Sequence, residues 1–307
     1  MNKLNEIIEK QTFEKNKLYL LLKPSLEYGF FYQNGIVYFA AKSTSGSAKE
    51  SVQTAYLDMN LGVYITSDSE QCSFETGNYD MLAFKDRLDS PEFDVFFNIC
   101  CSYSQSPAEM EFSEFFSSLV ELFKKTKEGS QKNLIGLIGE LIFIKRLNDD
   151  YGINVSENWH LSGSNGKFDF SFPQFNIEIK TSTNGNMTFL LKHEQIFNNQ
   201  KNYICVISII ETGEGDSLKT LVEYFSNNDP FKNNVKFQIA IQRELLKVTE
   251  KKDKERKFVL DTIDVFDCSK LKTIGQIPGC IGNIQYEYNF SEVDSVDLAN
   301  LFEAEQC

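Results

Sequence analysis

The chain has 307 residues and carries 31 Lys and Arg against 44 Asp and Glu, which gives a formal net charge of −13 at pH 7. Its hydrophobic content of 41%, with only six prolines, supplies enough apolar surface for a core and excludes a disordered chain. The negative charge argues against a polycation that wraps nucleic acid nonspecifically, although a local neutral or positive groove can still bind it.

The cysteine pattern and the hydropathy indicate the compartment. Seven cysteines form an odd number without any C-x-x-C pair, so neither a disulfide framework nor a zinc ribbon is indicated. The first six residues lack an apolar signal core, and the longest apolar stretch, residues 135–144, is interrupted by Gly139 and Glu140. We therefore expect a soluble, cytoplasmic protein with no membrane partner.

The N-terminal third is rich in strand-forming residues. Asn34 and Gly35 separate two aromatic and β-branched runs, and this pair predicts a tight hairpin because both residues tolerate positive φ. Residues 93–101 are aromatic and predict a further short strand. We expect a β-rich N-terminal module over residues 1–105.

Two helices are predicted next. Residues 106–109, Ser-Pro-Ala-Glu, have the pattern of a capping box, and apolar residues then recur at helical spacing over 110–123. A second helix is predicted over residues 132–148 and is apolar nearly all round, which indicates burial. Glu140 is the exception in that helix.

Two short strands follow, at residues 168–172 and 175–181, and both alternate with period two. If they pair around a turn at residues 173–174, Asp169 lies opposite Glu178. Ile179 then faces the core, while Glu178 and Lys180 face away from it.

The opposed carboxylates are the strongest chemical signal in the sequence. Directly opposed residues have Cβ atoms roughly 4.5–5.5 Å apart, so Asp169 and Glu178 would repel each other unless a cation lay between them. A hard divalent ion such as Mg²⁺ prefers carboxylate oxygens, and Lys180 lies on the same face. The alternative is an exposed strand face on which Lys180 pairs with Glu178 or Asp169 in surface ion pairs, worth about 0–1 kcal/mol each.

The rest of the chain alternates between strand and helix patterns. Strands are predicted at residues 187–191, 203–210, 258–266 and 284–290, and helices at 217–225 and 237–247. A mixed-charge run over residues 247–257 indicates a solvated helix end, with contact to phosphates as the alternative.

The spacing Asp169, Glu178, Ile179, Lys180 resembles the D-x(n)-(D/E)-x-K core of the PD-(D/E)XK nuclease superfamily. An acidic residue two positions before a lysine occurs three times in the chain, but only here in an alternating strand with an acidic partner. Phe168 stands where the superfamily name has Pro. The likeness to the PD-(D/E)XK family found with restriction-like and phage-defence gene clusters extends over most of the chain.

The resemblance implies roles for individual residues. Asp169 and Glu178 would bind Mg²⁺ or Mn²⁺, with the backbone carbonyl of Ile179 as a third ligand. Glu140 would complete the site directly or through water, since many members carry an acidic residue on the preceding helix. Lys180 would stabilise the developing phosphorane charge or position the attacking water.

The resemblance also implies the fold and the domain organisation. We expect an α/β protein in which a restriction-endonuclease-like mixed sheet is flanked by helices. The nuclease-like core would span residues 106–215, after the β-rich module, and a C-terminal α/β extension over residues 216–307 would lie against it.

The function implied is metal-dependent DNA endonuclease activity in a restriction-like or phage-defence system. The alternative is a catalytically inactive DNA-binding or scaffold subunit of such a system. The partners expected are DNA and an ATPase or another subunit of the system, and a homodimer is compatible with these expectations.

Other residues have both a structural and a functional interpretation. A helix edge that reaches water would explain Glu140 as well as a metal site does, and Gly136 and Gly139 indicate close packing against a strand. The loop at residues 162–167 is interpreted as the rim of the site rather than a phosphate loop. His193 is interpreted as a solvated residue at a helix start, with DNA contact as the alternative.

Overall fold

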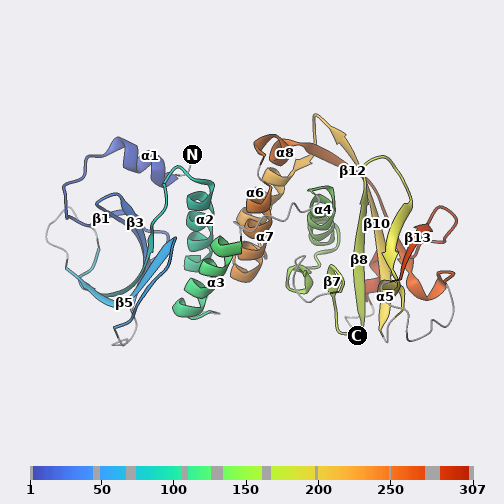
Figure 1. Cartoon of the computed structure of the whole chain (residues 1–307), viewed down its shortest axis with the longest axis horizontal. Helices are drawn as coiled ribbons and strands as arrows, with labels where there is room; N and C mark the ends of the chain where they lie inside the picture. The colour runs from blue at the N-terminus through green and yellow to red at the C-terminus, as the bar shows by residue number, and fades with distance from the viewer. Residues whose placement is uncertain are drawn as a thin grey trace. The chain divides into compact units, whose positions relative to one another are not determined.

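A computed structural model describes residues 3–43, 49–66, 74–105, 110–125, 134–160, 167–197, 200–248, 250–273 and 284–303 (Figure 1). The chain forms two compact units. Unit 1 comprises Met1–Ser130 and Phe225–Lys247, and unit 2 comprises Gln131–Tyr224 and Val248–Cys307. These boundaries differ from the three segments expected from the sequence, because a later helix returns to unit 1.

Unit 1 is built on a six-stranded antiparallel sheet with the order β1-β2-β3-β6-β5-β4. The predicted hairpin at Asn34 and Gly35 is confirmed, and their φ angles of 52° and 88° lie in the left-handed region that the turn needs. The strands are β1 (Tyr19–Leu22), β2 (Tyr28–Gln33), β3 (Ile36–Lys42), β4 (Ser51–Gln53), β5 (Leu57–Ile65) and β6 (Gly77–Phe84).

The helices of unit 1 include one that the sequence interpretation missed. The strand predicted at residues 93–101 is wrong, because these residues lie in α2 (Pro91–Gln105). Ser90 Oγ accepts a hydrogen bond from the Phe93 amide at 3.2 Å, so Ser90 caps the helix and Pro91 begins it. The other helices that contribute to unit 1 are α1 (Lys3–Lys10), α3 (Phe112–Lys125) and α7 (Val235–Lys247).

The two faces of the unit 1 sheet carry different side chains. Phe39 of β3 and Phe84 of β6 belong to the main core with residues of α2, α3 and α7. Alternate positions on the opposite face form a smaller cluster around Phe31, Ala40 and Met81. The period-two alternation of these strands therefore separates a helix-covered face from a second face. The capping box predicted at residues 106–109 lies outside the described residues.

Unit 2 is built on a mixed five-stranded sheet with the order β11-β12-β10-β8-β7, in which β8 and β10 are parallel and the other pairs antiparallel. Its strands are β7 (Phe170–Ser171), β8 (Phe175–Ser182), β10 (Lys201–Thr212), β11 (Asp216–Ser217) and β12 (Lys257–Asp267). A separate antiparallel pair joins β9 (Thr188–Lys192) to β13 (Gln285–Asn289).

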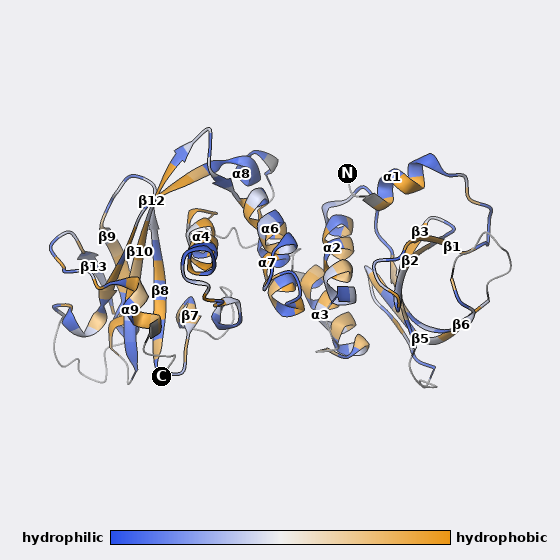
Figure 2. Ribbon diagram, turned by 180° about the vertical axis from the view of Figure 1, so that it is seen from behind, coloured by the Kyte–Doolittle hydropathy of each residue, from blue (hydrophilic) through white to orange (hydrophobic). Residues whose placement is uncertain are grey.

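Helix α4 (Leu134–Tyr151) contacts β8 and β10, and the opposite side of β10 contributes Ile204 and Val206 to a second cluster. Eight consecutive residues of β10 are buried, as expected of a strand covered on both faces (Figure 2). The remaining helical segments are α5 (His193–Ile196), α6 (Leu218–Asn227), α8 (Lys251–Glu255), α9 (Leu298–Glu303) and the 3₁₀ turns η2 (Ser156–Asn158) and η3 (Cys268–Lys270).

This arrangement confirms the fold class expected from the sequence, an α/β protein whose mixed sheet is accompanied by helices, consistent with a restriction-endonuclease-like fold. Among the described residues, no helix combines the length and apolar character that a membrane crossing requires.

Candidate active site

Helix α4 places Glu140 inside unit 2. Leu141 and Phe143, its near neighbours, are fully buried, and Glu140 itself is only 6% exposed. Its Oε2 accepts a hydrogen bond of 2.7 Å from the indole Nε1 of Trp159. The interpretation of Glu140 as a helix edge that reaches water is therefore wrong, because a buried carboxylate must be held by donors from the protein.

The hairpin has the register expected from the sequence. Phe170 pairs with Ile177 and Ser171 with Asn176, while the amide of Phe172 donates to the carbonyl of Phe175 at 2.9 Å. Continuation of this register by one residue places Asp169, just before β7, level with Glu178. The turn at residues 173–174 and the alternation of both strands were sufficient to predict this alignment.

Asp169 is held in place at its side chain and at its backbone. Its Oδ2 accepts a hydrogen bond from the Ile179 amide at 2.8 Å, and its backbone carbonyl accepts one from the His160 amide at 2.7 Å. Burial raises the pKa of Asp169 well above its ordinary value, and the negative charges of Glu178 and Glu140 raise it further. The Ile179 amide and Lys180 oppose this increase in the pKa.

Glu178 and Lys180 form an ion pair along β8. Lys180 Nζ lies 2.6 Å from Glu178 Oε1, and the two side chains are only 19% and 11% exposed. The prediction that these residues face away from the core is wrong for Glu178, which is buried. The alternative of an ion pair is correct in its partners, but the pair does not lie on an exposed strand face, so the small energy of a surface pair does not apply to it.

The structure thus brings Glu178 and Glu140 into electrostatic range of Asp169. Glu140 lies on α4, Glu178 on β8 and Asp169 just before β7, and Lys180 supplies one positive charge beside them. Ile179 is buried, and its amide is the group that orients Asp169. The role of its carbonyl as a third metal ligand stays a prediction.

The donor chemistry of this cluster fits a hard divalent cation. Its side chains include three carboxylates, the donors that Mg²⁺ and Mn²⁺ prefer. Burial, followed by repulsion from Glu178 and Glu140, raises the pKa of Asp169, and a bound cation would offset both effects. Among the described residues, no three His, Cys, Asp or Glu side chains are gathered closely enough to hold a metal ion. Ligation would therefore fall to Asp169 and Glu178, completed by backbone or water oxygens.

Trp159 is the residue of this site that the sequence interpretation missed. It lies beside the hairpin, where it forms an isolated antiparallel bridge with Phe170, and it is only 7% exposed. It is the single tryptophan of the chain, but nothing in the local sequence indicates that its indole reaches a carboxylate 19 residues earlier.

The other candidate residues lie in ordinary surroundings. His193 at the start of α5 contacts Tyr286 OH through Nδ1 at 2.5 Å, so it is not simply a solvated residue. Lys167 pairs with Glu194 at 3.4 Å, while residues 162–166 of the predicted rim lie outside the described residues. In the mixed-charge run, Arg256 forms a two-pronged contact of 2.8 Å with Glu211.

The comparisons with known proteins identify the family. Residues 32–291 match the model of the DUF4420 family, which is described as "Putative PD-(D/E)XK family member". The chain belongs to this family. Neither the curated proteins nor the solved structures contain a match. The expected relationship is thereby confirmed, and membership of this family suggests a nuclease-like function for the chain.

Proposed function

We propose that this DUF4420 protein is a DNA endonuclease that hydrolyses phosphodiester bonds with the help of a divalent cation, Mg²⁺ or Mn²⁺. The observation that carries the proposal is the approach of Asp169, Glu178 and Glu140 beside Lys180 at the β7–β8 hairpin. A cluster of buried carboxylates with one lysine costs folding free energy, and the cost is understandable if the cluster binds a cation.

The protein groups would divide the work as follows. Asp169 and Glu178 would hold the ion, with the Ile179 carbonyl as a third ligand and Glu140 acting through a bound water. The bound ion would supply a more acidic water and offset negative charge on the phosphate. Lys180 would hold the attacking water or stabilise the added charge on phosphorus, while a new P–O bond forms and an ester P–O bond breaks.

Two hydrogen bonds, one from a backbone amide and one from a side chain, would keep this arrangement in place. The Ile179 amide fixes the orientation of Asp169, and Trp159 fixes Glu140 through its indole. Both donors favour the ionised carboxylates, which are the forms that bind metal. The site therefore carries the supports that a rigid metal-binding cluster requires.

The first prediction concerns Lys180. We expect Lys180→Ala to reduce nicking of supercoiled plasmid DNA by on the order of 10²-fold or more, because it removes the positive charge beside the reacting phosphate. Mn²⁺ binding, measured by calorimetry, should largely survive. Asp169→Ala should abolish both cleavage and metal binding, since it removes a ligand.

Lys272→Ala is the matched control, because Lys272 lies in the same unit on an exposed turn. It should cleave like the unaltered protein. Equal cleavage by Lys180→Ala and the unaltered protein would refute the assignment. The proposal would also fail if the protein, supplied with Mg²⁺ or Mn²⁺ and with the products of its neighbouring genes, never nicked DNA.

A non-catalytic DNA-binding or scaffold subunit is the second candidate function. The observation in its favour is the 2.6 Å ion pair between Lys180 and Glu178, which stabilises the cluster without any metal. Metal separates the two functions: an endonuclease should be stabilised against thermal unfolding by Mn²⁺ through Asp169, and a scaffold should not.

The biological setting that we propose is a restriction-like or phage-defence system. With a net charge of −13, the chain would bind DNA weakly by itself at physiological salt. We therefore propose that a partner, such as an ATPase of the same system, delivers the DNA to the site.

A further inference from the structure

Unit 1 contains a hollow on the sheet face that the helices leave uncovered. It has a volume of about 690 Å³ and is bounded by the segment before β1, the β2–β3 hairpin and strands β5 and β6. This volume is within the range of about 300–1,000 Å³ that is typical of sites for small ligands. A duplex is far wider than such a hollow, but a single nucleotide is of the right size.

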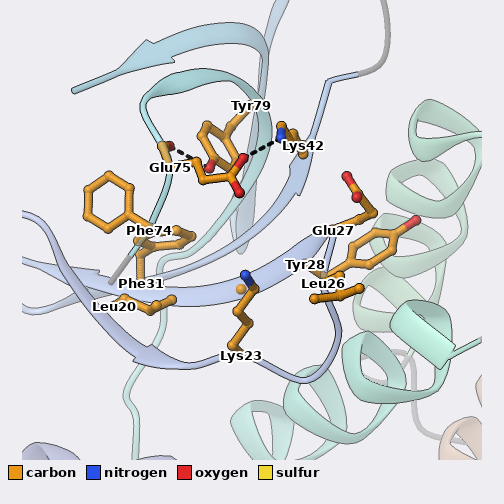
Figure 3. A pocket seen from close by; sticks show the side chains of 11 residues that line it. Leu20, Lys23, Leu26, Glu27, Tyr28, Phe31, Lys42, Phe74, Glu75 and Tyr79 are labelled. Atoms are coloured by element: carbon orange, nitrogen blue, oxygen red, sulfur yellow. Dashed lines mark hydrogen bonds and ion pairs between the residues drawn. The ribbon is translucent and has the colours of Figure 1, made fainter. Parts of the chain in front are cut away.

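A smaller hollow on the same sheet face is lined by Phe31, Phe74 and Tyr79, among other residues (Figure 3). Phe74 lines both hollows and lies against Phe31 with ring centroids 5.2 Å apart. Phe31 in turn contacts Tyr79 at 6.0 Å. These rings belong to the smaller apolar cluster of the sheet, and Phe74 is the one among them that lines the larger hollow.

The basic rim of the hollow is built by specific hydrogen bonds. Asn16 has a φ of 65° and is tied to the β2–β3 hairpin, because its amide donates to Asn34 Oδ1 at 2.8 Å and its carbonyl accepts from Gln33 Nε2 at 2.9 Å. A third bond of 3.0 Å joins the Asn34 and Asn16 side chains. These contacts fix the backbone that carries Lys15 and Lys17 at the rim.

The charge of the lining is opposite to that of the chain. Among the described residues that line the hollow, Lys15 and Lys17 carry a charge and none is an Asp or Glu, whereas residues 1–130 as a whole carry 12 Lys and Arg against 19 Asp and Glu. Glu14 forms an ion pair of 3.7 Å with Lys17, but its side chain is 77% exposed, so this surface pair is weak. Asp58, beside Tyr38, is 3.1 Å from Lys85. An anion is therefore the favoured occupant.

The remaining lining groups suit a base. Tyr38 offers a half-buried aromatic ring. Gln33, whose Nε2 donates to Asn16, offers its side-chain oxygen as an acceptor, and Asn60, whose Oδ1 accepts from Ser51, offers its side-chain nitrogen as a donor. An aromatic ring, amides and two lysines together match the ring, edge and phosphate of a nucleotide.

We propose that this hollow binds one unpaired nucleotide of a DNA strand, with the base against Tyr38 and the neighbouring phosphates at Lys15 and Lys17. This inference rests on the proposed function, since it takes DNA as the substrate, and it names the feature of DNA that unit 1 recognises. A nucleotide that is flipped out of a duplex, bulged or single-stranded satisfies the requirement, and a paired one does not.

The test measures binding of the full chain in EDTA, where cleavage cannot contribute. The probes are three fluorescent duplexes, one fully paired, one with a single bulged adenine nucleotide, and one with an abasic residue in place of that nucleotide. We expect the bulged duplex to bind at least about fivefold more tightly than either of the others, because the base stacks on Tyr38.

Variants of the rim lysines and of Tyr38 separate the contribution of charge from that of base stacking. Lys15→Gln/Lys17→Gln should weaken binding to the bulged duplex by about tenfold or more, while Lys10→Gln/Lys49→Gln, which removes two exposed charges from the same unit, should leave the preference unchanged. Tyr38→Phe should retain the preference for the base, and Tyr38→Leu should lose it. Thermal unfolding of each variant verifies that it is folded.

Equal affinity for the three duplexes would overturn the inference, as would unaltered binding by Lys15→Gln/Lys17→Gln. If deoxyadenosine monophosphate alone competes as strongly as the bulged duplex, the hollow serves free nucleotides and the assignment to a DNA strand is wrong. A preference for the bulge that persists in a protein unable to cleave any DNA would uphold this inference and refute the endonuclease. Cleavage of DNA by a protein that shows no preference for the bulged duplex would uphold the endonuclease and refute this inference.

Discussion

At the scale of single residues, the ionisation of Asp169 links stability to function. The folded protein holds a proton on Asp169 more tightly than the unfolded chain does, because burial and two neighbouring carboxylates raise its pKa. Below the ordinary pKa of an aspartate, the group is protonated in both states and costs nothing. As the pH rises from there through the raised pKa, the folded state loses stability.

The second prediction follows from this loss of stability when Asp169 becomes ionised in the folded protein. In EDTA at neutral pH, Asp169→Asn should raise the unfolding temperature, because an amide keeps an oxygen for the Ile179 amide and removes the buried charge. Calorimetry at several pH values measures the effect, which should vanish at acidic pH. The control is Asp294→Asn at an exposed position, which should change little. A lower unfolding temperature for Asp169→Asn at neutral pH would contradict the argument.

The third prediction concerns the pH dependence of metal binding. Since the ion competes with a proton on Asp169, Mn²⁺ affinity should increase as the pH rises through the raised pKa of Asp169. Lys180 lowers that pKa, so Lys180→Ala should move the rise in affinity to higher pH. Titration calorimetry over a pH series tests both statements. A midpoint that moves to lower pH in this variant would exclude the proposed coupling.

At the scale of elements, the contact between α4 and β8 determines where Glu140 lies. A Cβ added at Gly139 would lie 1.9 Å from Thr181 Oγ1, so the glycine allows the helix to approach the strand. This contact confirms the expectation, made from the sequence, that Gly139 packs closely against a strand. The next residue along α4 is Glu140, which reaches the site because of that approach.

The fourth prediction tests this contact. Gly139→Ala should destabilise the protein, since overpacking costs about 1–3 kcal/mol and the helical advantage of Ala is about 1 kcal/mol or less. Thr181→Ala should relieve part of the loss, as measured by urea unfolding in a double-mutant cycle. Gly213→Ala is the control, because a Cβ there meets nothing within 4 Å. A fully additive cycle would show that the contact is not the cause.

The sequence was sufficient for the local parts of the site and insufficient for the rest. Alternation and turn residues predicted the register that aligns Asp169 with Glu178, because both signals are local. The contact of Trp159 with Glu140 depends on how α4 lies against the sheet, which no local pattern encodes. The same reason explains why Glu178 is buried rather than exposed.

The wrong prediction of a strand at residues 93–101 has a different cause. The aromatic residues of 93–101 were interpreted by their type, which favours strands, although Phe93, Phe96 and Cys100 recur at helical spacing. The helical spacing of these residues, and Ser90-Pro91 as a helix N-terminus, were the better signals. The return of residues 225–247 to unit 1 is a long-range event, so the segments at 106–215 and 216–307 could not anticipate it.

At the scale of the whole molecule, the charge is distributed unevenly. Residues 131–210 contain 7 Lys and Arg and 7 Asp and Glu, so the segment that carries the candidate site is neutral. The net negative charge of the chain lies in residues 1–130 and 211–307. A bound cation would make the surroundings of the site locally positive while the rest of the chain stays acidic.

The fifth prediction concerns the division into units. A fragment of residues 131–307 retains α7 but lacks α2 and α3, against which α7 lies in unit 1. The fragment should therefore expose apolar residues such as Val235 and Ile239, bind a hydrophobic dye and self-associate. Coexpression with residues 1–130 should suppress both effects, and gel filtration measures the outcome. A monomeric fragment that binds no dye would contradict this division.

The return of α7 to unit 1 also affects the order in which the protein can mature on the ribosome. Residues up to 130 emerge first, yet the layer formed by α2 and α3 stays open until residue 247 has been made. At a synthesis rate of roughly 5–20 residues per second, this wait lasts on the order of ten seconds. The acidic residues of the candidate site are synthesised within that interval, so a nascent chain can present them before unit 1 is complete.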